Sequence, residues 1–357
     1  MDHTQDTRSL PAVIVHTIIL VNTSLLSLTG NSLVCIAFYR NRRIRTITNF
    51  YVLSLAVADL MVAVLLFPFG AVASGFRRWP FSFNFCQFAG FLAVYWGQVS
   101  TCTLALTSIN RYFCVVKPQK YSKYFTRKKT LSIVIVWVSL LVQTLSLYTI
   151  PVIYRWDYDN LYCRATFHDE MIERLFFIVC GCLFTVPMVL VILGYGRVYC
   201  AVRQHNTAVF PFLQGSNVQR GTHISAQEIK AARILFAALF GYCICWIPFI
   251  VILILQFGFQ LSIPHYAKPI YPLFSAISSW INPVIYGFMN RSMRKEFRNT
   301  LFCKNDWWQG KYNPGIFTAI QFWKVVLSFI MIDVRELESA RKQAENNLTT
   351  LIVNFLT

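Results

Sequence analysis

The sequence predicts an all-α membrane protein, a seven-transmembrane helix bundle followed by a short cytoplasmic amphipathic helix. Three observations predict this fold. Of the 357 residues, 56% are hydrophobic and only 13% are charged, whereas soluble proteins carry about 25% charged residues. Seven apolar runs reach the roughly 20 residues that a helix needs to cross a bilayer. The basic residues are concentrated in every second connection between those runs.

Each apolar run is expected to be helical, because a helix satisfies all of its own backbone hydrogen bonds in lipid. The expected spans are residues 12–39, 48–76, 84–116, 130–150, 171–202, 226–257 and 266–288. Four of them contain a proline, namely Pro68, Pro187, Pro248 or Pro283. We expect these prolines to kink the membrane helices rather than end them.

The chain is expected to divide into an N-terminal segment of residues 1–11, a membrane domain of residues 12–303 and a tail of residues 304–357. The membrane domain ends in an amphipathic helix over 290–303, in which apolar residues recur every four positions between basic ones. These residues are Met293, Phe297 and Leu301, with Arg294, Lys295 and Arg298 between them. The tail has no functional interpretation.

The formal net charge of +18 could indicate a nucleic-acid-binding protein, but the position of the charges argues against it. Residues 40–45, 111–129, 197–233 and 291–304 hold 21 Lys and Arg residues, against 7 in the alternate connections. Lys and Arg accumulate on the cytoplasmic side of membrane proteins. We therefore expect an extracellular N-terminus and a cytoplasmic C-terminus. We also expect no cleavable signal peptide, because the first eleven residues are polar.

Within these spans the sequence carries a series of landmarks, one or more in each. They are Gly30-Asn31, Leu55-Ala56-Val57-Ala58-Asp59, Asn110-Arg111-Tyr112, Trp137, Pro187 with Tyr195, Cys245-Trp246-Ile247-Pro248, and Asn282-Pro283-Val284-Ile285-Tyr286. Because all of them occur in order, the chain over residues 12–303 resembles the rhodopsin-like (class A) G-protein-coupled receptors. That resemblance implies a receptor that binds an extracellular ligand and activates a heterotrimeric G protein, not an enzyme. No catalytic constellation or zinc-binding spacing appears in the sequence.

The resemblance implies roles for three cysteines. Cys86, at the start of the third span, and Cys163, in the following outer loop, match the disulfide bridge of the family in an oxidising compartment. Cys303 is a candidate for palmitoylation, with an unmodified thiol as the alternative. Most of the other cysteines lie inside spans, where cysteine serves as a small apolar residue.

Asp59 is the acid that we place deep inside a span, where a charge is costly and indicates function. The resemblance implies an allosteric sodium ion held by Asp59 with Ser100, Ser278 and Asn282. Asn31 is a further expected neighbour. Ser278 stands where many relatives carry Asn, and a water-bridged polar network without an ion is the alternative.

The resemblance also implies a switch at the cytoplasmic end of the bundle. Its residues are Asn110, Arg111, Tyr112, Tyr195, Glu228 and Tyr286. An ion pair between Arg111 and Glu228 would hold the resting state, and breaking it would release the sixth helix. Asn110 replaces the usual acid, and a solvated ion pair with little effect is the alternative.

The expected ligand cavity is an apolar chamber with one amide, which is typical of a small-molecule site. Its expected residues are Ala93, Val94, Gly97, Gln98, Val179, Leu183, Trp246, Phe249, Ile250, Leu253, Pro272 and Ala276. Ala93 stands where amine receptors carry Asp, and Ala276 where opsins carry the retinal lysine. A neutral, lipophilic small molecule is therefore the expected ligand.

Several alternatives stay open. The run 49–59 and the Asn-Arg-Tyr form at 110–112 are similar to melatonin receptors, but Pro283 and Leu147 depart from that subfamily. A short peptide ligand is compatible with the acidic outer loop, and a photoreceptor or a transporter is disfavoured. A signalling-silent partner that heterodimerises with another receptor remains an alternative because of Asn110.

Overall fold

The computed structural model describes residues 6, 8–126, 132–146, 152–212 and 226–301. The tail 304–357 and the candidate lipidation site at Cys303 lie outside the described residues, as does Leu147. The backbone of Glu228 is described but its side chain is not.

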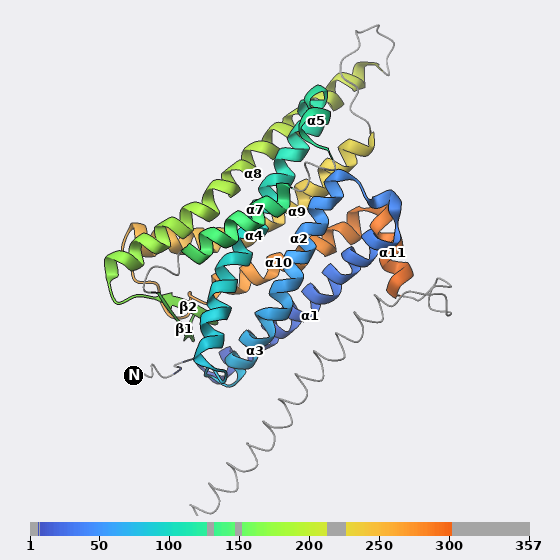
Figure 1. Ribbon diagram of the computed structural model, residues 1–357. Helices are drawn as coiled ribbons and strands as arrows, with labels where there is room; N and C mark the ends of the chain where they lie inside the picture. Colours follow the sequence, from blue (N-terminus) through green and yellow to red (C-terminus); the bar gives the residue numbers. More distant parts are fainter. Residues whose placement is uncertain (1–5, 7, 127–131, 147–151, 213–225, 302–357) are drawn as a thin grey trace, which may run out of the picture. The chain divides into compact units, whose positions relative to one another are not determined.

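The described residues form long helices that run alongside one another, with one β-hairpin at one end (Figure 1). In chain order the elements are α1 (Leu10–Arg40), the 3-10 turn η1 (Arg42–Ile44), α2 (Ile47–Leu65), α3 (Phe67–Gly75), α4 (Phe83–Val116), α5 (Pro118–Tyr124), α7 (Ser132–Ser146), β1 (Ile153–Asp157), β2 (Tyr162–Thr166), α8 (Glu170–Phe212), α9 (Ala226–Leu253), the π-helical turn η3 (Ile254–Gly258), α10 (Ile270–Met289) and α11 (Arg291–Leu301). We call the end that carries β1 and β2 the hairpin end, and the end that carries α5 and α11 the opposite end.

The predicted seven-helix bundle is confirmed. Among the described residues, five segments are long and apolar enough to cross a membrane. They are Leu10–Arg40, Ile47–Gly75, Phe83–Val116, Glu170–Gln204 and Arg233–Gln256. The other two predicted spans correspond to α7, an apolar helix described over 15 residues, and to the 20-residue α10.

The second span is interrupted where its proline predicts a kink. Helix α2 ends at Leu65, Leu66 leaves helical geometry with φ −125° and ψ −55°, and α3 resumes at Phe67 with Pro68 in its first turn. Proline lacks the amide hydrogen and its ring clashes with the carbonyl four residues earlier. Pro248 and Pro283, in contrast, lie within continuous helices.

The outer faces of the helices are apolar, which is the reverse of a soluble protein. Ile135, Leu193, Val142 and Ile247 are among many large apolar side chains that are exposed along the spans. Lipid is the solvent for such surfaces, so the polar groups of the spans are expected inside the bundle. The protein therefore uses its interior for polar contacts between helices.

Several of these contacts join helices that are far apart in the sequence. The Asn31 side-chain amide on α1 donates to the Ser279 carbonyl on α10 at 2.8 Å. Trp137 Nε1 on α7 donates to Thr103 Oγ1 on α4 at 3.2 Å. Hydrogen bonds of this kind contribute about 0.6 kcal/mol each in membrane bundles, so their main effect is to define how the helices face one another.

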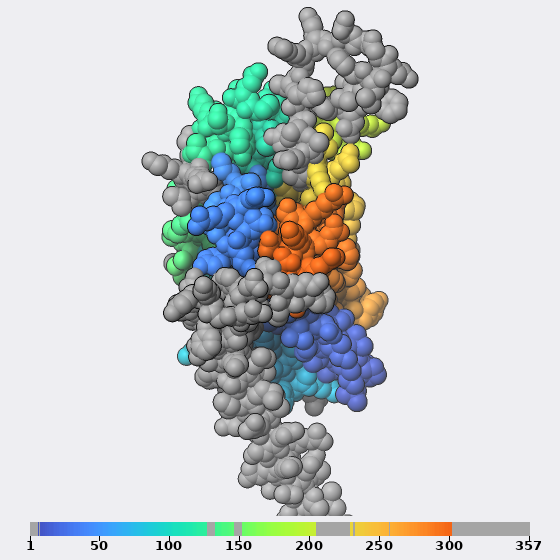
Figure 2. All heavy atoms as spheres, turned by 90° about the vertical axis from the view of Figure 1, so that its right-hand side faces the viewer, coloured from blue at the N-terminus to red at the C-terminus, as the bar shows by residue number. Residues whose placement is uncertain are grey.

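The predicted amphipathic helix is present as α11, and its apolar face packs on the bundle. Met293 is buried in the same cluster as Tyr286, and Phe297 packs against that cluster. Leu301, in contrast, is exposed. In Figure 2 the orange end of the described chain, which includes α11, lies beside the blue N-terminal helices.

The β-hairpin was not predicted, and two cross-links attach it to the start of α4. The predicted Cys86–Cys163 disulfide is confirmed and ties β2 to α4. Gln87 clamps β1 through both atoms of its amide, with Nε2 donating to the Tyr154 carbonyl at 2.6 Å and Oε1 accepting from the Tyr154 amide at 2.9 Å. The hairpin is thereby held against the bundle as a roof.

Gly90 is required for this attachment. A Cβ atom at Gly90 would overlap the Tyr154 ring and lie 2.8 Å from the Cys163 carbonyl oxygen. We expect Gly90→Ala to destabilise the protein by about 1–3 kcal/mol, which is typical of overpacking. The matched control is Gly196→Ala on α8, where a Cβ meets nothing within 4 Å.

Thermal unfolding of the two purified variants measures the difference. Gly196→Ala is expected to leave the melting temperature unchanged or to raise it, because alanine favours helix more than glycine does. Equal melting temperatures for the two variants would show that the hairpin does not depend on close approach at Gly90.

Candidate functional site

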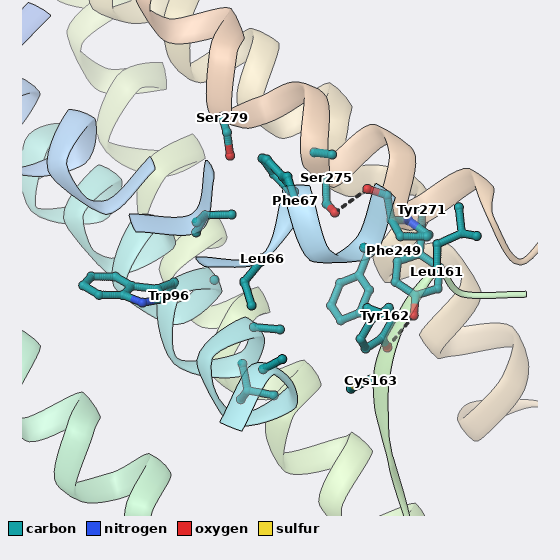
Figure 3. A pocket seen from close by; sticks show the side chains of 18 of the residues that line it. Leu66, Phe67, Trp96, Leu161, Tyr162, Cys163, Phe249, Tyr271, Ser275 and Ser279 are labelled. Carbon is teal, nitrogen blue, oxygen red and sulfur yellow. Dashed lines mark hydrogen bonds between the residues drawn. The ribbon is translucent and has the colours of Figure 1, made fainter. Parts of the chain in front are cut away.

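A cavity of about 220 Å³ lies inside the bundle at the hairpin end. Side chains from α2, α3, α4, α8, α9 and α10 form its walls, and residues of the hairpin cover it. In Figure 3, Tyr162, Tyr271 and Phe249 lie together at one side of the cavity, while Ser279 lies on the other. The cavity continues down to Asp59.

Seven of the twelve predicted ligand-binding residues line this cavity. They are Ala93, Val94, Gly97, Trp246, Phe249, Pro272 and Ala276. Gln98, Val179, Leu183, Ile250 and Leu253 do not line it. Gln98 is fully buried, with neither amide atom hydrogen-bonded in the described structure. The predicted ligand contacts remain predictions for all twelve.

On α8 the cavity is lined by different residues from those predicted. Phe176, Cys180 and Phe184 line it at helical spacing, whereas Val179 has 45% of its surface exposed on the outside of the helix. One residue along a helix turns the side chain by about 100°. Since nearly every position of this span is apolar, the sequence pattern does not reveal which face points inward.

The hairpin covers the cavity, and its residues were not predicted to line it. Trp156, Leu161, Tyr162 and Cys163 all line the cavity. The Tyr271 hydroxyl on α10 donates to the Tyr162 hydroxyl at 2.5 Å, which joins the roof to the wall. Burial raises the pKa of the Tyr162 phenol, although Arg164 and the bond from Tyr271 act in the opposite direction. Tyr162 is therefore a neutral hydroxyl.

Three of the described residues that line the cavity carry a hydrogen-bond donor without a partner. The indole N–H groups of Trp96, Trp156 and Trp246 are buried and have no partner in the described structure. The described residues that line the cavity include no Lys, Arg or His, and Asp59 is the acid among them. A buried donor without an acceptor is costly, so the cavity favours an occupant that carries uncharged acceptor atoms.

The floor of the cavity has the ligand chemistry of a small hard cation. Asp59 Oδ2 and Asn282 Oδ1 are both buried without a hydrogen-bond partner in the described structure, and Ser100 and Ser278 line the cavity beside Asp59. Carboxylate, amide and hydroxyl oxygens suit such ions. The Asn31 amide nitrogen donates to the carbonyls of Ser27 and Ser279. The predicted sodium residues therefore fit an ion.

An aromatic stack connects the cavity to the centre of the bundle. Trp246 stacks on Phe184 at 4.9 Å and on Tyr242 at 5.6 Å. The Tyr242 and Thr101 hydroxyls are hydrogen-bonded at 2.8 Å. A bound molecule that displaces Trp246 would therefore act on the packed contact between α9 and α4.

At the opposite end, Arg111 is buried in α4 and its Nε has no partner in the described structure. The side chain of the neighbouring Asn110 is hydrogen-bonded to two other helices. Its Oδ1 accepts from Thr48 Oγ1 on α2 at 2.9 Å, and its Nδ2 donates to the Tyr121 hydroxyl on α5 at 3.4 Å. The predicted Arg111–Glu228 pair stays a prediction, because the Glu228 side chain is not described.

Three tyrosines accompany Arg111 in the predicted switch. Tyr195 on α8 and Tyr286 on α10 are both buried in one apolar cluster, and the Tyr195 hydroxyl has no partner in the described structure. Tyr112 packs against the smaller cluster that contains Val115 and Val198. The buried, unpaired atoms of Arg111 and Tyr195 are capable of forming new bonds when the helices move.

Two groups of ion pairs lie at the hairpin end of the bundle. Asp159, in the hairpin turn, accepts from Lys268 Nζ at 3.0 Å and contacts His265 Nδ1 at 2.6 Å. In the second group, Arg8 and Arg77 both bind the Asp6 carboxylate. Burial alone would raise the pKa of Asp6, but the hydrogen bonds from Arg8 outweigh it and lower the pKa. Asp6 is therefore ionised at neutral pH.

Comparison with known proteins identifies relatives of this fold and site. Residues 30–286 match the family model of the 7 transmembrane receptor (rhodopsin family). Among curated proteins, the chain is 28% identical over 306 residues to 5-hydroxytryptamine receptor 4 of Cavia porcellus, covering 79% of this chain and 78% of that one. It is 26% identical over 302 residues to neuropeptide FF receptor 2 of Rattus norvegicus, covering 78% and 70%.

Among solved structures, squid rhodopsin has the same fold. The TM-score is 0.69 at 20% sequence identity, and the match covers 84% of this chain and 89% of that one.

The Thr101–Tyr242 bond allows the central contact to be tested. We expect Thr101→Val and Tyr242→Phe each to destabilise the protein by about 1–3 kcal/mol, because each leaves a buried partner unsatisfied. The double variant should lose little more than one single variant. Thermal unfolding of the three proteins measures this coupling.

Thr107→Val serves as the control, because its hydroxyl bonds to the Thr103 carbonyl of its own helix. Combined with Tyr242→Phe, its effect should be additive. Additive losses in the Thr101–Tyr242 pair would mean that this bond does not couple α4 to α9.

Proposed function

This chain belongs to the rhodopsin family of seven-transmembrane receptors, and from that premise we propose its function. It is a plasma-membrane receptor with an extracellular N-terminus and a cytoplasmic C-terminus. It binds a small, neutral, lipophilic ligand in the cavity beneath the hairpin and activates a heterotrimeric G protein. The observation that carries the ligand class is the lining of that cavity, which is apolar and offers unpaired donors but no cation.

The charge distribution in the cavity supports an uncharged ligand. Ala93 lines the wall where a carboxylate would be needed to hold an ammonium group. Asp59 is buried at the floor, among groups that suit a small ion. An anionic ligand would lack a counter-charge among the described lining residues, which include no Lys, Arg or His. A neutral molecule with carbonyl or ether oxygens would satisfy the donors at Trp156 and Trp246.

Other ligand classes have less support from these residues. The relatives are named for 5-hydroxytryptamine, an amine, and for a neuropeptide. A basic peptide would need accessible acids; Asp157 and Asp159 already pair with Arg164 and with Lys268, while Asp169 and Glu170 are exposed. Retinal would need a lysine at Ala276, and Lys268 is held by Asp159 at 3.0 Å.

An allosteric sodium ion would be held by Asp59, Ser100, Ser278 and Asn282. When bound, such an ion supplies the positive charge that a buried carboxylate otherwise lacks. Asp59 then remains ionised in the core of the bundle, and its oxygens keep α2 and α10 in one arrangement. Movement of α10 toward Asp59 would crowd these oxygens, so the ion would favour the resting state.

The receptor would act by shifting an equilibrium that exists without ligand. A ligand that fits the open state better increases its population. The stack from Trp246 to Tyr242 and Thr101 connects the cavity to the core around Tyr195 and Tyr286. Arg111 would leave its pair with Glu228 and contact the G protein on a cytoplasmic face rich in Lys and Arg.

The ligand class can be tested with matched compounds. Each pair consists of an uncharged aryl amide and the corresponding protonated aryl alkylamine, and thermal stabilisation of the purified receptor is the measurement. We expect the uncharged members to stabilise the wild type more. The control, Ala93→Asp, introduces a carboxylate at the wall and should reverse the preference. Stronger stabilisation of the wild type by the amines would contradict the proposal.

Coupling can be tested without a ligand. Activation of a panel of G proteins is measured for wild type, Glu228→Ala and Arg111→Ala at matched surface expression. We expect Glu228→Ala to raise basal activity severalfold, because it removes the acid that holds Arg111, and Arg111→Ala to abolish it. Unchanged basal activity in Glu228→Ala would contradict the switch, and silence of all three proteins would favour a signalling-silent partner of another receptor.

A further inference from the structure

A second hollow lies between α8 and α9, toward the opposite end of the bundle. Its volume is about 280 Å³, and it has no lining residue in common with the ligand cavity. Tyr195, Val198 and Tyr199 on α8 line it, as do Arg233 and Phe236 on α9. We call this hollow the α8–α9 crevice.

The walls of the crevice are apolar and open to the surface of the bundle. Tyr199 and Phe236 are both exposed, and their rings stack at 6.0 Å across the two helices. Phe240, one helical turn along α9, extends the aromatic surface. Val198 at the base is buried. An exposed aromatic surface on a membrane helix faces lipid acyl chains.

One rim of the crevice is basic. Arg203 on α8 and Arg233 on α9 both line it and both are exposed. None of the described residues that line the crevice is acidic. Two guanidinium groups from neighbouring helices present several donors in fixed forks, which is the geometry that binds a phosphate group.

The floor of the crevice reaches the core of the proposed switch. Tyr195 lines it, is 3% exposed, and its hydroxyl has no hydrogen-bond partner in the described structure. The crevice thus combines an anion-binding rim, an apolar wall and a buried polar atom. A long amphiphile with a negative head matches the basic rim and the apolar wall together, whereas a soluble anion would use only the rim.

We infer that the α8–α9 crevice is a binding site for an anionic phospholipid. The headgroup phosphate lies between Arg203 and Arg233, and one acyl chain lies over Tyr199 and Phe236. The site is on the face that the proposal above assigns to the cytoplasm, where anionic lipids are concentrated. Because the lipid spans α8 and α9, it stabilises whichever arrangement of the two helices keeps the crevice formed.

Lipid binding to the purified full chain can be counted by native mass spectrometry. The probes are dioctanoyl-phosphatidylglycerol, dioctanoyl-phosphatidylcholine, and glycerol phosphate as a headgroup without chains. We expect phosphatidylglycerol to bind at least about tenfold more tightly than phosphatidylcholine, which corresponds to a charge-assisted contact. The double variant Arg203→Gln with Arg233→Gln should lose this preference, and glycerol phosphate should not compete.

Arg197→Gln is the matched control, because Arg197 is exposed on α8 but does not line the crevice. It should keep the preference of the wild type. Phe236→Ala should weaken both lipids, because it removes part of the wall. An unchanged preference in the double variant, an equal loss in Arg197→Gln, or competition by glycerol phosphate would each overturn the inference. None of these outcomes depends on the receptor ligand or on a G protein.

Discussion

The requirement that backbone polar groups be satisfied inside a bilayer governs the rest of this structure. It makes the spans helical and turns apolar side chains outward, as at Ile135 and Leu193. Polar side chains are then left to the interior, where each must find a partner. Asn31 and Trp137 do so by joining helices. Asp59 Oδ2, Arg111 Nε and the Tyr195 hydroxyl have no partner in the described structure, and the proposed mechanism depends on these residues.

Close approach at two glycines shapes the cavity within this frame. Gly90 admits the hairpin, and Gly97 admits the Phe184 ring, which a Cβ atom would meet at 2.9 Å. Phe184 in turn stacks on Trp246. The roof, the wall and the aromatic stack are therefore parts of one packed assembly, and an occupant of the cavity is in contact with the core that leads to Tyr242 and Thr101.

The charged side chains named above lie in separate parts of the bundle. At the hairpin end, Asp6 and Asp159 are paired with neighbouring cations. In the part of the chain that the structure describes, no cationic side chain lines the cavity, and Asp59 lies at its floor. At the opposite end, Asn110 bonds to Thr48 and Tyr121, which keeps α2, α4 and α5 together without a carboxylate. A neutral ligand, a small cation and a G protein would thus each meet a distinct environment.

The sequence by itself determined the number of spans, a kink near Pro68 and the surface helix, which follow from hydropathy and from the geometry of proline. Its resemblance to a receptor family implied the Cys86–Cys163 bridge. Only the tertiary structure decided which face of α8 lines the cavity, because Val179 and Cys180 are equally apolar in a span where lipid and core both favour such residues. It also decided the hairpin roof, since Tyr162 and Tyr271 meet only when segments about a hundred residues apart pack together.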